Sequence, residues 1–164
     1  MARQLNNILK YEYYYSNSPY RQRVLSDFLN GKIRVIIATS SLGLGLDLSN
    51  IRLIIHIDQP YTLYDYAQET RRAGRDNSPS EALLLLSKAS NSTSDHRLNS
   101  KEQFENDVIS RYITSSCRRA SLNSYLNGNE SEKCDSTEIP CDICQPEYSS
   151  KSIFHFFHFL LYIY

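Results

Sequence analysis

Three short apolar runs constrain the fold of this chain more than any other feature of its sequence. They cover residues 33–38, 52–57 and 81–87 and are rich in Ile, Val or Leu. Such runs are typical of strands that are buried on both faces of a parallel sheet. A helix is predicted before the first run and another between the second and third. This order predicts an α/β fold with right-handed crossover connections.

Both predicted helices carry start and stop signals. The first begins at Ser18, which is followed by Pro, and ends at Gly31. The second begins at Thr62 with a capping-box-like pair and continues through Arg72 before Gly74 ends it. These boundaries leave three loops at the carboxyl ends of the predicted strands, which is where parallel sheets bind ligands.

The loop after the first predicted strand is suited to phosphate binding. Its glycines let the backbone approach a phosphate closely, its hydroxyls can donate to one, and its carboxylate can accept from a sugar hydroxyl. Taken alone, the pattern fits a tight turn that needs glycine better than it fits a ligand site. The candidate residues are Thr39, Ser40, Gly43, Gly45 and Asp47.

An arginine-rich stretch from Gln68 to Asp76 follows the second strand. Arg72 and Arg75 are three residues apart and would share one helical face, whereas Arg71 would point elsewhere. Two guanidinium groups on one face can bind a triphosphate and stabilise charge during phosphoryl transfer. The alternative is that these cations only complement the dipole at the helix C-terminus.

The chain resembles the second motor domain of superfamily 2 helicases in three segments. They are Ala-Thr-Ser-Ser-Leu-Gly-Leu-Gly-Leu-Asp, Ile-Ile-His-Ile-Asp-Gln-Pro and Tyr-Ala-Gln-Glu-Thr-Arg-Arg-Ala-Gly-Arg-Asp. The last segment resembles the RecQ-like DNA helicases in particular. The resemblance covers roughly residues 13–144. It implies a RecA-like parallel sheet with flanking helices, followed by a small helical zinc-binding subdomain.

The resemblance also implies site residues and ligands. It implies an ATP-dependent 3′-to-5′ DNA helicase that acts in the nucleus on single-stranded or forked DNA. ATP with Mg²⁺ would be held mainly by a first motor domain, supplied by a partner or by a full-length helicase. The residues carried over are Arg75 as arginine finger, Arg72 as its companion, Gln68 as the motif's opening polar residue, Thr39 and Ser40 as DNA contacts, and Gly43, Gly45 and Asp47 on the nucleotide side.

Several departures from the family pattern bear on activity. Arg71 and Asn77 stand where these helicases usually have Gly. The sequence contains no Gly-x-x-x-x-Gly-Lys-Ser/Thr loop and no Asp-Glu-x-His element. The domain also begins one strand late, since the first strand that such helicases have is missing. A sheet without this strand is predicted to have exposed backbone N–H and C=O groups. We therefore expect an N-terminally truncated helicase region that is inactive without a first motor domain.

Four cysteines are the candidate metal ligands: Cys117, Cys134, Cys141 and Cys144. The Cys-Asp-Ile-Cys spacing lets two thiolates share one tetrahedral Zn²⁺, and the earlier two can complete it. Four thiolates leave no position for a substrate, so the site would be structural. The alternative is four free thiols. RecQ-like proteins carry a similar zinc platform, and the wider gap before Cys141 resembles telomere-associated RecQ-like proteins of filamentous fungi.

The expected organisation is a motor domain (residues 1–90), a linker (91–99), a zinc-binding subdomain (100–150) and an aromatic tail (151–164). The tail has three interpretations: a docked C-terminal element, an interfacial anchor, or an unnatural end from a shifted reading frame or unspliced sequence. The last is favoured, because the tail is dense in aromatic residues and lacks the spacing of polar residues that an amphipathic helix or a surface strand would show.

The balance of charge excludes binding driven by a global field. Lys plus Arg and Asp plus Glu both number 18. No apolar stretch reaches the roughly 20 residues of a membrane-spanning helix, so no membrane partner is expected. Two alternatives to a helicase half remain: a non-catalytic zinc-stabilised module that binds DNA or protein, or a remnant of a decayed gene. An RNA helicase is the third choice.

Overall fold

The computed structural model describes residues 11–15, 17–38, 51–86 and 99–145, and the backbone of residues 159–163. The chain divides into two compact units. The first unit comprises residues 1–60, 68–89 and 156–164, and the second comprises residues 61–67 and 90–155.

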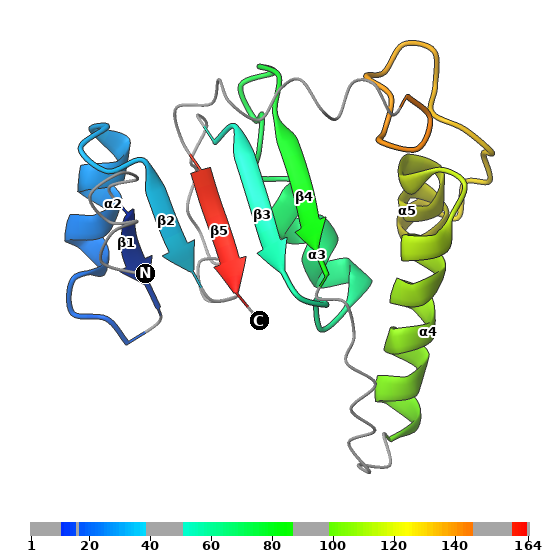
Figure 1. The fold of residues 1–164 in the computed structure, drawn as a ribbon, viewed down its shortest axis with the longest axis horizontal. Coiled ribbons are helices and arrows are strands. Elements are labelled where there is room, and N and C mark those ends of the chain that lie inside the picture. The colour runs from blue at the N-terminus through cyan, green and yellow to red at the C-terminus, as the bar shows by residue number, and fades with distance from the viewer. Residues whose placement is uncertain (1–10, 16, 39–50, 87–98, 146–158, 164) are drawn as a thin grey trace. The chain divides into compact units, whose positions relative to one another are not determined.

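A five-stranded sheet forms the first unit, and every pair of neighbouring strands in it is parallel (Figure 1). The spatial order is β1-β2-β5-β3-β4. The strands are β1 (Tyr11–Tyr14), β2 (Val35–Ala38), β3 (Leu53–Ile57), β4 (Glu81–Leu85) and β5 (Phe159–Ile163). The predicted α/β class is confirmed, and β2, β3 and β4 fall within the three apolar runs.

Two strands of the sheet were not predicted. β1 pairs with β2, with Tyr11 opposite Val35, and forms one edge of the sheet. β5 lies between β2 and β3 and pairs with both. Of the three interpretations of the tail, the backbone of β5 corresponds to the docked C-terminal element. A missing strand was expected to leave backbone N–H and C=O groups of the sheet unpaired. Along the facing sides of β2 and β3, pairing with β5 takes the place of such a strand.

The two helices of the crossovers differ from prediction at their ends. α2 (Arg21–Leu29) begins three residues after Ser18, whose Oγ accepts a 3.2 Å hydrogen bond from the Tyr20 N–H before the helix starts. Gly31 follows it at φ +68°, the left-handed conformation that favours glycine. α3 (Leu63–Thr70) is capped as expected, since Thr62 Oγ1 accepts from the Asp65 N–H at 2.9 Å.

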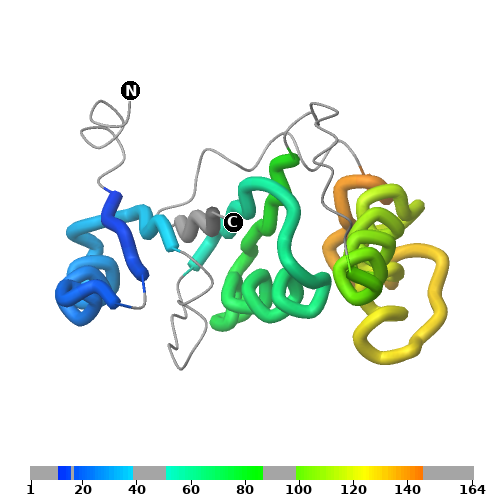
Figure 2. Tube along the Cα trace, turned by 90° about the horizontal axis from the view of Figure 1, so that it is seen from below, coloured from blue at the N-terminus to red at the C-terminus, as the bar shows by residue number. Residues whose placement is uncertain are grey.

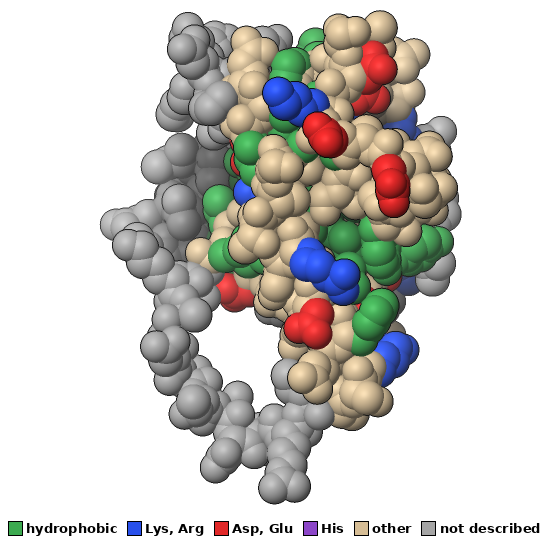
Figure 3. Space-filling model, turned by 90° about the vertical axis from the view of Figure 1, so that its right-hand side faces the viewer, with side chains coloured by type: hydrophobic (Ala, Val, Ile, Leu, Met, Phe, Trp, Pro, Cys, Tyr) green, Lys and Arg blue, Asp and Glu red, His purple; other side chains and the backbone are tan. Residues whose placement is uncertain are grey.

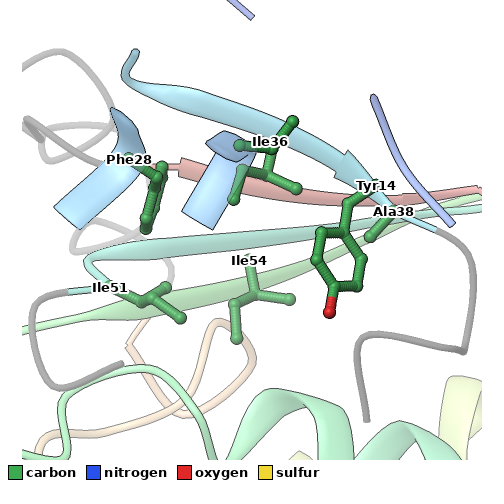
Figure 4. Packing of buried hydrophobic residues seen from close by; sticks show 7 residues of the cluster. Tyr14, Phe28, Ile36, Ala38, Ile51 and Ile54 are labelled. Carbon is green, nitrogen blue, oxygen red and sulfur yellow. The ribbon is translucent and has the colours of Figure 1, made fainter. Parts of the chain in front are cut away.

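The core of the first unit lies between α2 and the sheet (Figure 4). Phe28 from α2 packs with Ile36 of β2 and Ile54 of β3, and all three side chains are fully buried. Burial of such side chains stabilises a fold by about 1.5–3 kcal/mol each. Ile54 and His56 lie two residues apart on β3 and so point to the same face of the sheet.

The second unit contains α4 (Ser100–Thr114) and α5 (Arg118–Asn127), which pack together (Figure 2). α4 is capped by Asn99, whose side chain accepts from the Glu102 N–H while Glu102 accepts from the Asn99 N–H. The capping box is therefore formed by Asn99 and Glu102. α5 ends at Gly128, which has φ +68°.

Charges of both signs are interspersed on the face drawn in Figure 3, with hydrophobic patches between them. This distribution agrees with the neutral net charge of the sequence. None of the helices in the described parts of the chain has the length and apolarity that crossing a membrane requires.

Candidate functional site

The loop that holds Thr39, Ser40, Gly43, Gly45 and Asp47 lies outside the described residues. Its two ends are described. It leaves the sheet after Ala38, at the carboxyl end of β2, and returns at Ile51, next to the amino end of β3. The two ends of this loop therefore lie at opposite ends of the parallel strands, the first at their carboxyl ends and the second at their amino ends.

The arginine turn, residues Arg71–Asp76, is not part of a helix. α3 ends at Thr70, and the chain continues in turns in which the Arg72 N–H donates to the Glu69 carbonyl at 3.2 Å. The prediction that Arg72 and Arg75 share a helical face is therefore wrong. Arg72 is only 8% exposed, whereas Arg75 is exposed to solvent.

Two contacts fix the arginine turn to the start of β3. The Gly74 N–H donates to the Ile51 carbonyl at 3.1 Å, and Gly74 adopts φ +67°. A Cβ at this glycine would lie 2.9 Å from the Ser78 carbonyl oxygen, so the close approach requires glycine. Arg52 binds Asp76 through both carboxylate oxygens, which holds the pKa of Asp76 below its usual value.

These contacts place the arginine turn at the amino edge of the sheet. The sequence predicts instead that ligand-binding residues lie at the carboxyl ends of the strands. The difference follows from the crossover, because β3 and β4 are parallel and the chain must return from the carboxyl end of β3 to the amino end of β4. The arginine turn consequently lies where the loop from β2 returns at Ile51. Gln68 is half-buried in the last turn of α3.

A buried pair that the sequence analysis missed connects α3 to β3. His56 Nε2 and Glu69 Oε2 lie 2.9 Å apart, and the two side chains are 0% and 6% exposed. A polar residue within an otherwise apolar strand is the only signal that the sequence offered. Because Glu69 accompanies Arg72 at the end of α3, this pair helps to fix where the arginine turn begins.

Breaking this pair is expected to destabilise the first unit strongly. His56→Ala leaves the Glu69 carboxylate buried without its imidazole partner, which costs about 3–5 kcal/mol. Urea denaturation of the full chain measures the change. Glu12→Ala is the control, because it breaks an exposed ion pair with Arg23 and should change stability by less than about 1 kcal/mol. Equal losses in the two variants would contradict the role given to the buried pair.

The four cysteines form a cluster in the second unit. Their Sγ atoms all lie within 4.8 Å of one another. Cys117 Sγ lies 3.6 Å from Cys134 Sγ and 3.9 Å from Cys141 Sγ. A tetrahedral ion with Zn–S bonds of about 2.3 Å sets sulfurs about 3.8 Å apart. The predicted ligand set is therefore brought together at a separation that suits zinc, and the cluster can hold a metal ion.

The environment of the cysteines favours different protonation states. Burial raises the pKa of Cys134 to about 12. Burial also acts to raise the pKa of Cys141, but backbone N–H donors from Cys144, Arg118 and Ile143 outweigh it and lower the value to about 6. The pKa values of Cys134 and Cys141 are therefore shifted in opposite directions within one cluster.

Arg118 ties the cysteine loop to α4. Its Nη1 donates to the carbonyls of Tyr112, at 2.8 Å, and Ile113 at the end of α4. Its Nε lies 3.5 Å from the carboxylate of Asp142, which sits between Cys141 and Cys144. Its guanidinium also lies over the Tyr112 ring, 5.6 Å from the centroid. Arg118 therefore positions the loop that carries Cys141 and Cys144, although Arg118 is not itself a metal ligand.

We expect Arg118→Ala to weaken zinc binding about 10- to 100-fold, the usual cost of removing a group that orients metal ligands. Competition with a chromogenic zinc chelator measures the affinity. Arg119→Ala is the matched control, since Arg119 is exposed and pairs with Glu138 on the surface at 3.6 Å. Equal zinc affinities for the wild type and Arg118→Ala would show that the cysteine loop adopts its conformation without Arg118.

The sequence of the chain is similar to those of known helicases. Residues 2–77 match the helicase conserved C-terminal domain. The chain is 35% identical over 133 residues to the ATP-dependent DNA helicase RecQ of Haemophilus influenzae, covering 76% of the chain and 21% of that protein. It is 40% identical over 134 residues to the ATP-dependent DNA helicase Q-like SIM of Arabidopsis thaliana, covering 75% and 15%.

A third relative is the RecQ-like DNA helicase blm-1 of Caenorhabditis elegans, which is 31% identical over 141 residues, covering 79% of the chain and 14% of that protein. The chain thus spans about a fifth or less of the length of these relatives. The similarity to them extends well beyond the helicase domain match at residues 2–77. By this domain and these relatives, the chain belongs to the RecQ-like superfamily 2 helicases and corresponds to their C-terminal motor region.

Proposed function

We propose that this chain supplies the second motor half of an ATP-dependent 3′-to-5′ DNA helicase, with Arg75 as its arginine finger. The observation that carries the proposal is the arginine turn. Its backbone is fixed through Gly74 to Ile51, two residues before β3, while Arg75 is exposed. An exposed guanidinium on an anchored turn can reach a nucleotide held by another domain without a loss of fold.

The chemistry asked of Arg75 is electrostatic. Charge spreads over the oxygens of the transferred phosphoryl group in the transition state, and a guanidinium placed there stabilises it. Arg72, which is buried, accompanies the finger, and Gln68 contributes a polar group in the last turn of α3. The sequence contains no Gly-x-x-x-x-Gly-Lys-Ser/Thr loop, so ATP with Mg²⁺ would be held by a first motor domain.

The remaining assignments extend the same proposal. Thr39 and Ser40 contact the DNA backbone, and Gly43, Gly45 and Asp47 face the nucleotide. The motor domain spans residues 1–90 and residues 91–99 are a linker. Residues 100–150 carry a structural Zn²⁺ on the four cysteines. Single-stranded or forked DNA is the substrate, and the nucleus is the compartment.

Reconstitution tests the proposal. The chain is mixed with, or fused to, the first motor domain of a RecQ helicase, and ATP hydrolysis is measured with single-stranded DNA, with single-stranded RNA and without nucleic acid. We expect little hydrolysis from the chain alone. With the first motor domain and DNA, hydrolysis should exceed the sum of the separate rates.

The other outcomes separate the alternatives. Stimulation by RNA but not by DNA would favour an RNA helicase. A silent mixture at every concentration, from a chain that is folded and holds zinc, would reject the motor half and leave a non-catalytic binding module. A chain that neither folds nor binds zinc would match a decayed-gene remnant.

A further inference from the structure

One strand alone joins the two halves of the sheet. Among the described strands, β2 pairs with β1 and β5, and β3 pairs with β4 and β5, so β2 and β3 meet only through β5. Leu161 stands opposite Ile37 on one side and Ile55 on the other. Since neighbouring strands lie about 4.8 Å apart, β2 and β3 are separated by the width of one strand.

Without an occupant, this gap would be costly. β2 is buried at three of its four residues and β3 at three of its five. Their backbone N–H and C=O groups along the gap would then lack partners in an apolar setting. Each unsatisfied buried group costs about 1–3 kcal/mol. The gap therefore strongly favours whatever extended segment can pair with both of its sides.

The gap also selects the kind of segment that fits. The segment must be parallel to both neighbours, about five residues long, and free of Pro and charge, because a central parallel strand is covered on both faces. Phe159–Ile163 has the sequence Phe-Leu-Leu-Tyr-Ile and meets each condition. About a hundred residues separate it along the chain from β3, so removing it from the gap interrupts no other element.

We propose that the gap between β2 and β3 is a binding site for an extended apolar strand, and that residues 159–163 of the same chain are its intramolecular ligand. The site takes the segment through backbone pairing on both sides, so an identical peptide added from outside can replace it. Occupancy of this site determines whether the two halves form one sheet. The inference does not depend on the proposed helicase activity.

Hydrogen–deuterium exchange of the full chain provides the first test. The amides of residues 159–163 should exchange at least about tenfold more slowly than those of an unstructured peptide of the same sequence. The protection should be the same at low and high protein concentration. Exchange at the unstructured rate would overturn the proposal. Protection that vanishes when the protein is diluted to monomers would also overturn it, because the occupant would then be a second copy.

Replacement provides the second test. Leu161→Pro removes a backbone donor from the centre of β5 and should increase amide exchange in both β2 and β3, whereas Ser152→Pro, outside the strand, should not. A synthetic peptide of residues 149–164 should restore protection to the Leu161→Pro chain, and the same peptide with Leu161→Pro should not. Unchanged exchange in β2 and β3 would overturn the proposal. If the variant does not fold, the wild-type measurement still decides.

Discussion

Removing zinc is expected to unfold α4, α5 and the cysteine loop while the parallel sheet stays folded. Residues 99–145 bury few large apolar side chains, chiefly Val108, Ile109 and Tyr112. Binding of structural Zn²⁺ supplies about 10–16 kcal/mol in small zinc domains, which exceeds what so small a core provides. Circular dichroism during chelation should show a loss of helix, and hydrogen exchange should assign it to these residues.

Ligand variants provide the control for this expectation. Cys117→Ser should abolish stoichiometric zinc binding and reproduce the effect of the chelator, since Cys117 is 1% exposed and begins α5. Ser136→Ala, in the same loop, should leave one zinc per chain by elemental analysis. A folded second unit in the zinc-free protein would show that four free thiols suffice.

The affinity for zinc should fall as the pH is lowered, and it should fall more steeply below the Cys141 pKa of about 6. Thiols must lose their protons to bind, so protons compete with the metal. At neutral pH this competition includes Cys134 and Cys144, whose pKa values are raised, that of Cys134 to about 12, whereas the pKa of Cys141 is lowered to about 6. Below the Cys141 pKa of about 6, a further proton competes and the loss of affinity with each pH unit steepens.

Arg75→Ala is expected to abolish ATP hydrolysis by the reconstituted motor with little change in ATP binding. Arginine fingers contribute about 10³- to 10⁵-fold to turnover, so a loss of about 10³-fold or more is the expected result. The fold should not change, because Arg75 is exposed. Turnover and binding of a fluorescent ATP analogue measure the two effects separately.

Arg71 offers a matched control in the same turn. It is also an exposed arginine, and it stands where the family usually has Gly. Arg71→Gly should keep hydrolysis, whereas Arg75→Ala should lose it. Unchanged turnover in Arg75→Ala would remove the proposed finger, and equal losses in both variants would indicate that the turn contributes only its positive charge.

How far the sequence predicted the structure depended on how local each signal was. β2, β3 and β4 were predictable because buried parallel strands are continuous apolar runs. β1 was missed because its Tyr-Glu-Tyr-Tyr sequence has no apolar run. β5 was missed because its apolar residues lie in a longer aromatic stretch whose place in the sheet no local pattern indicates.

The candidate sites show the same dependence. The cysteine cluster was predictable because ligand spacing alone indicates a shared ion. The spacing of Arg72 and Arg75 predicted a shared helical face, but α3 ends at Thr70 and the following turns carry Gly74 to its contact with Ile51. The His56–Glu69 pair joins two single residues thirteen apart, and no sequence pattern marks such a contact.

The position of β5 also bears on how the protein is made. During translation, β1 to β4 leave the ribosome well before residues 159–163, so the centre of the sheet is the last part to be synthesised. Contacts between segments so distant in sequence slow folding, because a long loop must close before they form. The nascent chain would therefore present two unjoined pairs of strands, β1-β2 and β3-β4, to chaperones until residues 159–163 emerge.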